Sequence, residues 1–330
     1  TAAPDARSSR CYPPGPCRSA GEPVIALAKF LFYLAAAALA AAALRMAAHQ
    51  AIRRALAAPR VREFADPAGQ GLAFETVRIP TANARTLHGW LIPPASTATR
   101  PAPAVVVLHG WGGNAQMMLP LAAPLHRAGF AALFIDARCH GLSDDDDFAS
   151  LPRFAEDVSQ ACDWLRAHAA DVAIDPARIA LLGHSVGAGA VLLAAARRQD
   201  LAAVVSVSAF AHPAEMMARW LAGKRIPPLV GRYVLRHVEA TIGHRFDDIA
   251  PLRSIARLSC PVLVVHGAQD EVVPADDARR LHAASAGRAE LLVLPGDHES
   301  FADLQGELQA VIAFLAAASA AGGDVGHDSV

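Results

Sequence analysis

A serine set between two glycines is the strongest chemical signal in this 330-residue sequence. Residues 183–187 read Gly-His-Ser-Val-Gly, with Ser185 at the centre. The apolar residues 179–182 before it predict a buried strand, and the Ala/Leu-rich residues 188–198 after it predict a helix. A strand, a tight turn with serine at its apex and a helix form a nucleophile elbow, in which small residues must flank the strained serine. We therefore expect Ser185 to be an activated nucleophile. The alternative is a Gly/Ser turn without chemistry.

A serine nucleophile needs a base and a group that orients the base. After an elbow serine these follow in the order Asp or Glu, then His. Asp270 comes after the apolar residues 262–265, and His298 comes after the apolar residues 291–294. We therefore expect His298 to be the general base and Asp270 to orient it. Otherwise Asp270 is a loop or helix-capping carboxylate and His298 a surface histidine.

Four other side chains compete for these roles. Glu271 would point away if the preceding aspartate points into the site, and Asp297 is too close in sequence to the histidine to bond its ring well. Ser143 and Cys139 are nucleophiles by type, but neither stands at an elbow. The sequence therefore favours the three residues named above.

The developing oxyanion needs backbone N–H donors. One should come from Val186, directly after the serine, and one from the loop after the third strand. That loop, residues 109–114, reads His-Gly-Trp-Gly-Gly-Asn, and we expect the N–H of Trp111 to be the second donor. The Trp111 ring either lines an acyl pocket or packs under the loop. Three residues are expected to support the site: His109 and Gly110 in this loop, and His184 in the elbow. His109 should brace the backbone of its loop.

Alternating strand and helix patterns surround these residues and predict an α/β fold. Eight segments read as strands: 74–80, 86–92, 104–108, 131–135, 179–182, 203–207, 262–265 and 291–294. Five read as helices: 115–128, 154–169, 188–198, 275–284 and 301–317. We expect a doubly wound, mainly parallel eight-stranded sheet whose first two strands are antiparallel. Such sheets carry their chemistry at the carboxyl ends of the strands.

A long interval separates two neighbouring strands of this pattern. Residues 209–257 are apolar, rich in Met and aromatic side chains, and interrupted by prolines. A solvated loop does not tolerate that content, so we expect a small helical cap inserted over the site. An ordinary crossover with a surface excursion is the alternative.

The N-terminal part has a different composition. Residues 1–23 predict a disordered tail, and residues 24–44 are apolar except for Lys29, which predicts a membrane anchor. A cleaved signal peptide or a buried soluble helix are the alternatives. Residues 45–71, which contain several arginines, are expected to form a helix and a linker. Their arginines are either solvated or in contact with anionic lipid. Five arginines follow the apolar run and three precede it, which favours a cytoplasmic catalytic domain. Because an export signal has its basic residues ahead of the apolar run, a periplasmic or secreted location stays open. The catalytic domain should span residues 72–318 and a disordered tail residues 319–330.

Composition excludes several other classes. The net charge is −1, so no basic excess points to nucleic acid. No metal-binding or dinucleotide motif occurs, and we expect neither a metal nor a cofactor. Cys11 and Cys17 could pair in an oxidising compartment, whereas the other three cysteines read as free. The acidic run at residues 144–147 reads as a solvated loop, with cation binding as the alternative. Nothing in the composition indicates an oligomeric state.

Five segments together resemble the α/β-hydrolase superfamily. They are residues 109–113 (His-Gly-Trp-Gly-Gly), 136–143 (Asp-Ala-Arg-Cys-His-Gly-Leu-Ser), 183–187, 266–270 and the loop of His298. The closest resemblance is to the serine-aminopeptidase-like and monoacylglycerol-lipase-like branch of bacterial serine hydrolases, over residues 72–318. It implies the roles assigned above to Ser185, His298 and Asp270. Two positions where glycine is common differ: Cys139, and Ala188 after the elbow.

A serine hydrolase acting on a small carboxylic ester or thioester is the expected function, because an apolar cap suits an acyl chain. The sequence leaves three alternatives. An aminopeptidase or amidase would need cap carboxylates for a free amine, and Glu215 and Glu239 are the only acidic residues there before Asp247. An acyltransferase would use an acceptor other than water. A non-catalytic scaffold on the same fold is the least expected.

Overall fold

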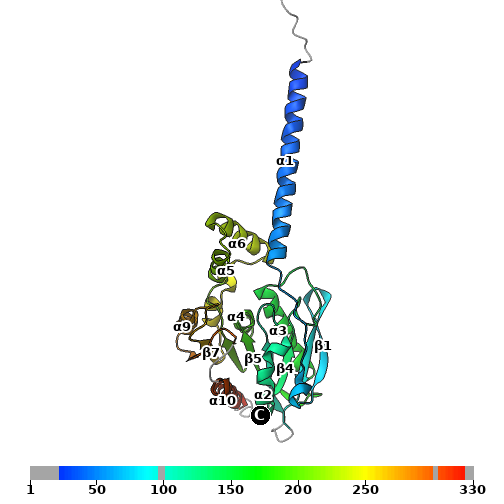
Figure 1. Cartoon of the computed structure of the whole chain (residues 1–330). Coiled ribbons are helices and arrows are strands. Elements are labelled where there is room, and N and C mark those ends of the chain that lie inside the picture. The colour runs from blue at the N-terminus through cyan, green and yellow to red at the C-terminus, as the bar shows by residue number, and fades with distance from the viewer. Residues whose placement is uncertain (1–21, 96–100, 300–303, 324–330) are drawn as a thin grey trace, which may run out of the picture. The chain divides into compact units, whose positions relative to one another are not determined.

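The computed structural model describes residues 22–95, 101–299 and 304–323 (Figure 1). They form two compact units, one ending at Ala55 and one beginning at Leu56. Of the expected tail at residues 1–23, residues 1–21, with the Cys11–Cys17 pair, lie outside the described residues, and residues 22 and 23 are helical. The first unit is the single helix α1 (Glu22–Ala55). Its residues 24–55 are long and apolar enough to cross a membrane, by length and composition alone. The helix continues 11 residues past the predicted end of the anchor at residue 44 and includes part of the expected linker.

The second unit is built on one eight-stranded sheet, as predicted. The strand order is β1-β2-β4-β3-β5-β6-β7-β8. Its strands are β1 (Glu75–Thr81), β2 (Arg85–Ile92), β3 (Ala102–Leu108), β4 (Ala131–Ile135), β5 (Ile174–His184), β6 (Ala203–Val207), β7 (Val262–Gly267) and β8 (Ala289–Leu294). Only β2 runs against its neighbours, so the sheet is mainly parallel with an antiparallel first pair.

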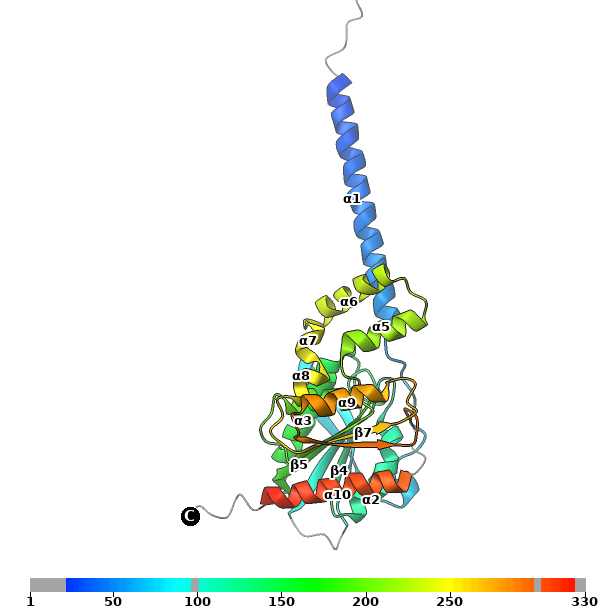
Figure 2. The same ribbon diagram turned by 90° about the vertical axis from the view of Figure 1, so that its left-hand side faces the viewer.

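Two hydrophobic cores lie on opposite faces of this sheet. Along β3, Ala104, Val106 and Leu108 enter one core while Val105 and Val107 enter the other. Successive strand residues point to opposite faces, so an uninterrupted apolar run can serve both cores. The first core is covered by α3 (Leu151–Ala167), α4 (Val186–Ala195), α8 (Pro251–Ile255) and α9 (Ala275–Ala284). The second is covered by η3 (Ala115–Leu121), α2 (Ala122–Arg127) and α10 (Leu304–Gly323), on the opposite side of the sheet in Figure 2.

Local chemistry explains where several helices differ from the prediction. The predicted helix 115–128 is divided into η3 and α2, because Pro120 interrupts it. Helix α3 begins three residues earlier than predicted, where the Ser150 side chain caps the N–H of Arg153. Helix α10 runs to Gly323, so residues 319–323 are helical and do not belong to a disordered tail. Residues 301–303 and 324–330 lie outside the described residues.

The interval between β6 and β7 contains the expected cap. It holds α5 (Pro213–Gly223), α6 (Pro228–Ile242), the short α7 (Phe246–Ile249) and α8. Both views show α5 and α6 projecting beyond the helices that cover the sheet (Figure 2). Residues 56–66, between α1 and the short helix η1 (Pro67–Gln70), have almost no regular structure, yet their side chains and backbone bind the rest of the second unit.

Candidate active site

Ser185 lies between the end of β5 and the start of α4, as an elbow requires. Its φ of 55° and ψ of −117° are rarely adopted by a residue with a side chain. A Cβ on Gly183 would overlap the backbone of Gly187, and a Cβ on Gly187 would overlap the carbonyl oxygens of Leu108 and His109. Only glycine at both positions lets the turn close and lets α4 approach the end of β3.

A continuous line of hydrogen bonds joins Ser185, His298 and Asp270. Ser185 Oγ lies 3.0 Å from His298 Nε2, and His298 Nδ1 lies 2.7 Å from Asp270 Oδ2. Because an ionised carboxylate only accepts, Nδ1 must carry the proton, which leaves Nε2 free to accept the serine hydroxyl. The three residues follow β5, β8 and β7, so the sheet brings residues separated by up to 113 positions into contact. Neither Glu271 nor Asp297 occupies the position of Asp270 next to the ring.

Asp270 is held as a carboxylate by four donors. Burial alone would raise its pKa, but hydrogen bonds from His266, His298 and the N–H of Val273 outweigh burial and lower the pKa below its usual range. Its Oδ1 accepts the N–H groups of Val272 and Val273 at 2.9 and 2.7 Å. Asp270 is therefore ionised at neutral pH and can stabilise a positive charge on His298.

His266 is a member of the site that the sequence did not reveal as one. The side chain is fully buried at the end of β7, with Nε2 at 3.3 Å from Asp270 Oδ2 and 2.9 Å from the carbonyl oxygen of Val273. Nε2–H therefore donates to both acceptors and fixes the turn that carries Asp270. The sequence shows that His266 precedes Asp270 by four residues. It does not show that the turn between them brings the two side chains into contact.

The loop after β3 lies directly against the serine. A Cβ on Gly110 would come within 3.1 Å of the Ser185 Cβ. His109 is fully buried and braces this loop as predicted, because Nδ1–H donates to the carbonyl oxygen of Gly110 and Nε2 accepts the N–H of Ala137. With both nitrogens engaged, and a pKa lowered chiefly by burial, His109 is a neutral structural residue.

The two expected oxyanion donors belong to Val186, directly after the serine, and to Trp111, directly after Gly110 in the loop against it. Val186 is the first residue of α4, so its N–H has no carbonyl four residues earlier in the helix. In the other loop, Gly112 donates its N–H to His140 Nε2 and Gly113 donates to the carbonyl of Gly110. These two bonds shape the turn around Trp111.

The Trp111 ring is 39% exposed and stacks on Phe154 at 6.3 Å between centroids. One face is therefore packed, and the rest is open to solvent. His140 also supports the ring edge-on, at 5.7 Å between centroids. Burial lowers the pKa of His140 to about 4, so it stays neutral while it accepts the N–H of Gly112.

His184, between the glycine and the serine of the elbow, holds the loop of the base. Its Nε2–H donates to the carbonyl oxygen of His298 at 2.8 Å. Burial lowers the pKa of His184, which keeps the ring neutral. The predicted supporting residue thus links the ends of β5 and β8.

The rival nucleophiles have structural roles. The Ser143 hydroxyl donates to the carbonyl of Asp136 and accepts the N–H of His88, both at 2.7 Å. Cys139 exchanges weak hydrogen bonds with the backbone of Asp146, and burial raises the pKa of its thiol. Neither group is positioned as an activated nucleophile.

The acidic run at residues 144–147 is only partly solvated: Asp145 and Asp147 are exposed, as predicted, whereas the Asp146 side chain is buried. Asp146 is paired with Arg138 at 3.0 Å and Arg153 at 3.1 Å, and its side chain is 3% exposed. Asp145 pairs with Arg60. Arg60 also donates to the carbonyl oxygens of residues 140, 141 and 143. The Arg60 side chain is still 36% exposed, but its guanidinium is engaged by these protein groups and is not free to bind lipid.

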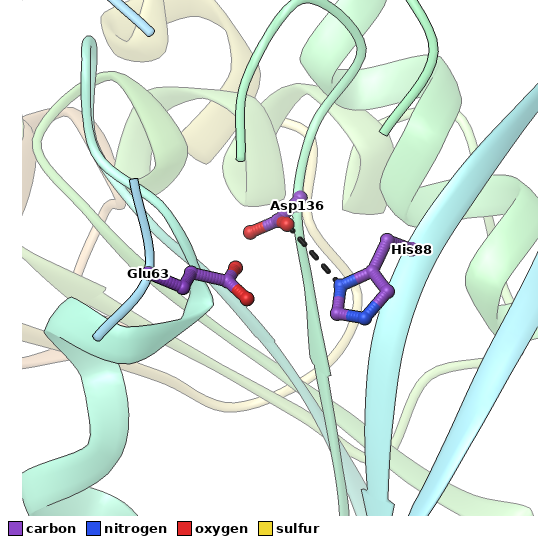
Figure 3. Close-up of side chains that lie close together, drawn as sticks. All are labelled: Glu63, His88 and Asp136. Carbon is purple, nitrogen blue, oxygen red and sulfur yellow. Dashed lines mark hydrogen bonds and ion pairs between the residues drawn. The ribbon is translucent and has the colours of Figure 1, made fainter. Parts of the chain in front are cut away.

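Three titratable side chains from distant segments meet beside the end of β4 (Figure 3). One donor atom each of Glu63, His88 and Asp136 lies within 4.8 Å of the others. Their donor types suit a divalent cation. However, Asp136 already accepts the N–H groups of Ala115 and Leu142 at 2.7 and 2.8 Å. No sequence motif marks these three residues as a metal site. The expectation that the protein holds no metal therefore stays a prediction, because nothing in the structure tests it.

A shared proton explains how two carboxyl groups can lie so close together. Burial, followed by the adjacent carboxylate of Asp136, raises the pKa of Glu63 to about 8. Burial raises the pKa of Asp136 too, but the hydrogen bond from His88, the electrostatic effect of the adjacent His109 ring and the hydrogen bond from Glu63 outweigh burial and lower the pKa to about 2. At neutral pH Glu63 is protonated and donates to Asp136, which ties residues 56–66 to the end of β4.

Comparison with known proteins agrees with this architecture. Residues 99–248 match the family described as serine aminopeptidase, S33. An uncharacterised protein of Mycobacterium tuberculosis is 33% identical over 233 residues, which cover 70% of this chain and 72% of that protein. An esterase of Pyrococcus furiosus superimposes with a TM-score of 0.63 at 20% identity, over 79% of this chain and 97% of its own. Est1E of Butyrivibrio proteoclasticus, solved with ferulic acid bound, gives 0.58 at 24% identity, over 74% and 99%.

The solved structures at this identity show the fold, and the mycobacterial relative and the matched family show the kinship. The elbow, the strand order and the positions of the site residues at the strand ends fit the same family. The chain therefore belongs to the serine aminopeptidase S33 family of the α/β hydrolase superfamily and is a hydrolase.

Proposed function

We propose that this hydrolase cleaves carboxylic esters or thioesters through an acyl-enzyme on Ser185. One observation carries the proposal, namely the hydrogen-bonded line from Ser185 Oγ through the His298 ring to Asp270. His298 is the base, Asp270 orients it, and the N–H groups of Trp111 and Val186 are the oxyanion donors.

In the first half-reaction Ser185 Oγ attacks the acyl carbonyl while its proton passes to His298 Nε2. The ionised Asp270 stabilises the imidazolium that forms. The carbonyl oxygen becomes an oxyanion, which the two backbone donors bind. His298 then gives its proton to the alcohol or thiol as it leaves. Water, deprotonated by the same nitrogen, attacks the acyl-enzyme and releases the acid.

The cap favours esters over peptides with a free amine. A site for the amine would need an available carboxylate, and the cap supplies only Glu215 and Glu239 before Asp247. Both oxygens of Glu215 are bound by Arg280, at 2.7 and 2.9 Å. Glu239 accepts the N–H of Phe246 at 2.8 Å. Glu215 is thus occupied by an arginine, and one oxygen of Glu239 is used by the backbone, so the cap offers a poor site for an ammonium group.

We also propose that α1 is a single membrane anchor, with the catalytic unit on the cytoplasmic side. Support comes from its apolar length and from Arg53 and Arg54 in its last turn. A cleaved signal sequence is the competing interpretation.

A fluorophosphonate probe tests the nucleophile directly. We expect mass spectrometry to locate the label on Ser185, and Ser185→Ala to lose the label and turnover of short p-nitrophenyl esters and thioesters by about 10⁴-fold or more. Ser159→Ala, which removes a hydroxyl on α3, is the matched control and should keep both. Labelling of folded wild-type protein at another residue, or turnover that survives Ser185→Ala, would refute the proposal.

A further inference from the structure

The outer part of the cap carries charge of one sign only. Residues 216–238 contain five Lys or Arg side chains and no Asp or Glu. Arg219 is bound to Asp277 at 2.9 Å. The other four are exposed, and none forms an ion pair with a carboxylate in the described ranges: Lys224, Arg225, Arg232 and Arg236. We call residues 218–236 the cap tip.

Large apolar side chains stand among these cations. Trp220 is 42% exposed, Leu229 71%, Val230 48% and Tyr233 45%. Lys224 Nζ lies 5.9 Å from the centre of the Trp220 ring. Apolar residues gathered on an exposed surface and surrounded by polar groups are a feature of binding sites.

Helix α6 shows that this surface is a distinct face. Its inward residues Gly231 and Val234 are buried, and Leu235 and Val238 pack against the first core. At 100° per residue, four residues lie on the opposite side of the helix. They are Leu229, Arg232, Tyr233 and Arg236, and all are exposed. The outward face thus alternates apolar and basic side chains, as in helices that lie in a membrane interface.

We infer that the cap tip binds the surface of a bilayer that contains anionic lipids. Trp220, Leu229 and Tyr233 enter the boundary between headgroups and acyl chains, and the four cations bind lipid phosphates. A second copy of this chain fits poorly, because a two-fold interface would place the same cations opposite one another. The chain also contains α1, which is long and apolar enough to cross a membrane. Lipid binding by the cap tip does not require ester hydrolysis, so the two proposals can fail separately.

Trp220 provides a local reporter in the full chain. The protein is reconstituted in nanodiscs of phosphatidylcholine, or of phosphatidylcholine with about a third phosphatidylglycerol, using brominated and ordinary lipids. Bromine quenches only nearby indoles, and Trp220→Phe gives the contribution of the other tryptophans. We expect Trp220 quenching to be at least twofold greater in the anionic discs. If the chain does not enter discs, addition to vesicles of the same compositions gives the same readout.

Reversal of the four cap-tip charges to Glu should abolish this difference. The matched control reverses four exposed arginines elsewhere in the second unit that form no ion pair with a carboxylate of the described residues: Arg85, Arg127, Arg257 and Arg279. We expect the control to retain the quenching, and thermal melts to show that both variants are folded. Equal quenching in neutral and anionic discs, or an unaffected cap-tip variant, would overturn the inference. Self-association or a protein partner that depends on these residues, without Trp220 quenching, would overturn it as well.

Discussion

Cys139 has a left-handed backbone, with a φ of 67°, at a position where glycine is common in related motifs. A side chain there costs roughly 1 kcal/mol, which glycine avoids. The thiol partly offsets this cost through its weak hydrogen bonds with the backbone of Asp146. The departure from the motif is therefore a strained position and leaves the hydrogen bonds of Ser185 in place.

Comparing Cys139→Gly with Cys139→Ala isolates this strain, because both variants lose the thiol. We expect the glycine variant to be the more stable by about 1 kcal/mol, the reverse of the usual order of Ala and Gly in a helix. Chemical denaturation of the two variants measures the difference. An alanine variant of equal or greater stability would show that the backbone relaxes.

In the proposed mechanism His266 would act on catalysis through its contact with Asp270, as a positioning residue. We expect His266→Leu to lower kcat by roughly tenfold, about 1.4 kcal/mol, with little change in KM. Loss of its hydrogen bond raises the pKa of Asp270 from its depressed value, so the deficit should grow as the pH falls. His266→Gln, which retains a donor near the position of Nε2, is the control and should recover most of kcat. A deficit that is the same at every pH would indicate a purely structural role.

At the scale of elements, residues 56–66 form a strap that the linker prediction did not foresee. Pro59 lies over Gly112. A Cβ on Gly112 would come within 2.9 Å of the Pro59 ring. Asn114 donates to the carbonyl of Val61 at 3.1 Å, and Gln116 accepts the N–H groups of Phe64 and Ala65. The strap therefore contacts the loop that carries Trp111, directly after the chain leaves α1.

The protonated Glu63 makes docking of the strap sensitive to pH. Its pKa is raised by burial to about 8, so the folded state holds a proton that the unfolded state releases above about pH 4.5. Stability therefore falls as the pH rises from about 5 to about 8. Because Glu63 is partly solvated, we expect a loss on the order of 1 kcal/mol. The depressed pKa of Asp136 acts only below about pH 4, outside this window.

Urea denaturation of wild type and Glu63→Gln across pH 5–9 measures this effect. The variant keeps a donor towards Asp136 but cannot ionise, so its stability should fall less than that of the wild type. Parallel curves for the two proteins would mean that Glu63 is ionised throughout.

At the scale of the whole molecule, both hydrophobic cores are made of residues after α1. The helix has its own physical requirement, because the side chains of residues 24–47 are exposed and mostly apolar. A bilayer satisfies that requirement without any change in the hydrolase unit.

The anchor proposal predicts that the full chain stays in membranes after alkaline carbonate extraction. The unit beginning at Leu56 should be released and keep its turnover of soluble esters, since its cores are complete. Protease added outside intact cells should spare a cytoplasmic catalytic unit. Release of the full chain by carbonate, or cleavage after the apolar run, would favour the signal-sequence interpretation.

The sequence by itself determined the sheet, the order of its elements and the positions of Ser185, Asp270 and His298 at strand ends. These features follow from local periodicity, from the steric demands of one turn and from the chain order of the partners. Only the tertiary structure decided that His266 supports Asp270 and that Arg60 and Glu63 bind the strap to residues 136–145, after β4. The roles of Arg60 and Glu63 depend on contacts between segments far apart in the chain. The role of Glu63 also depends on burial, which raises the pKa of its carboxyl group. The local spacing of residues encodes neither the contacts nor the burial.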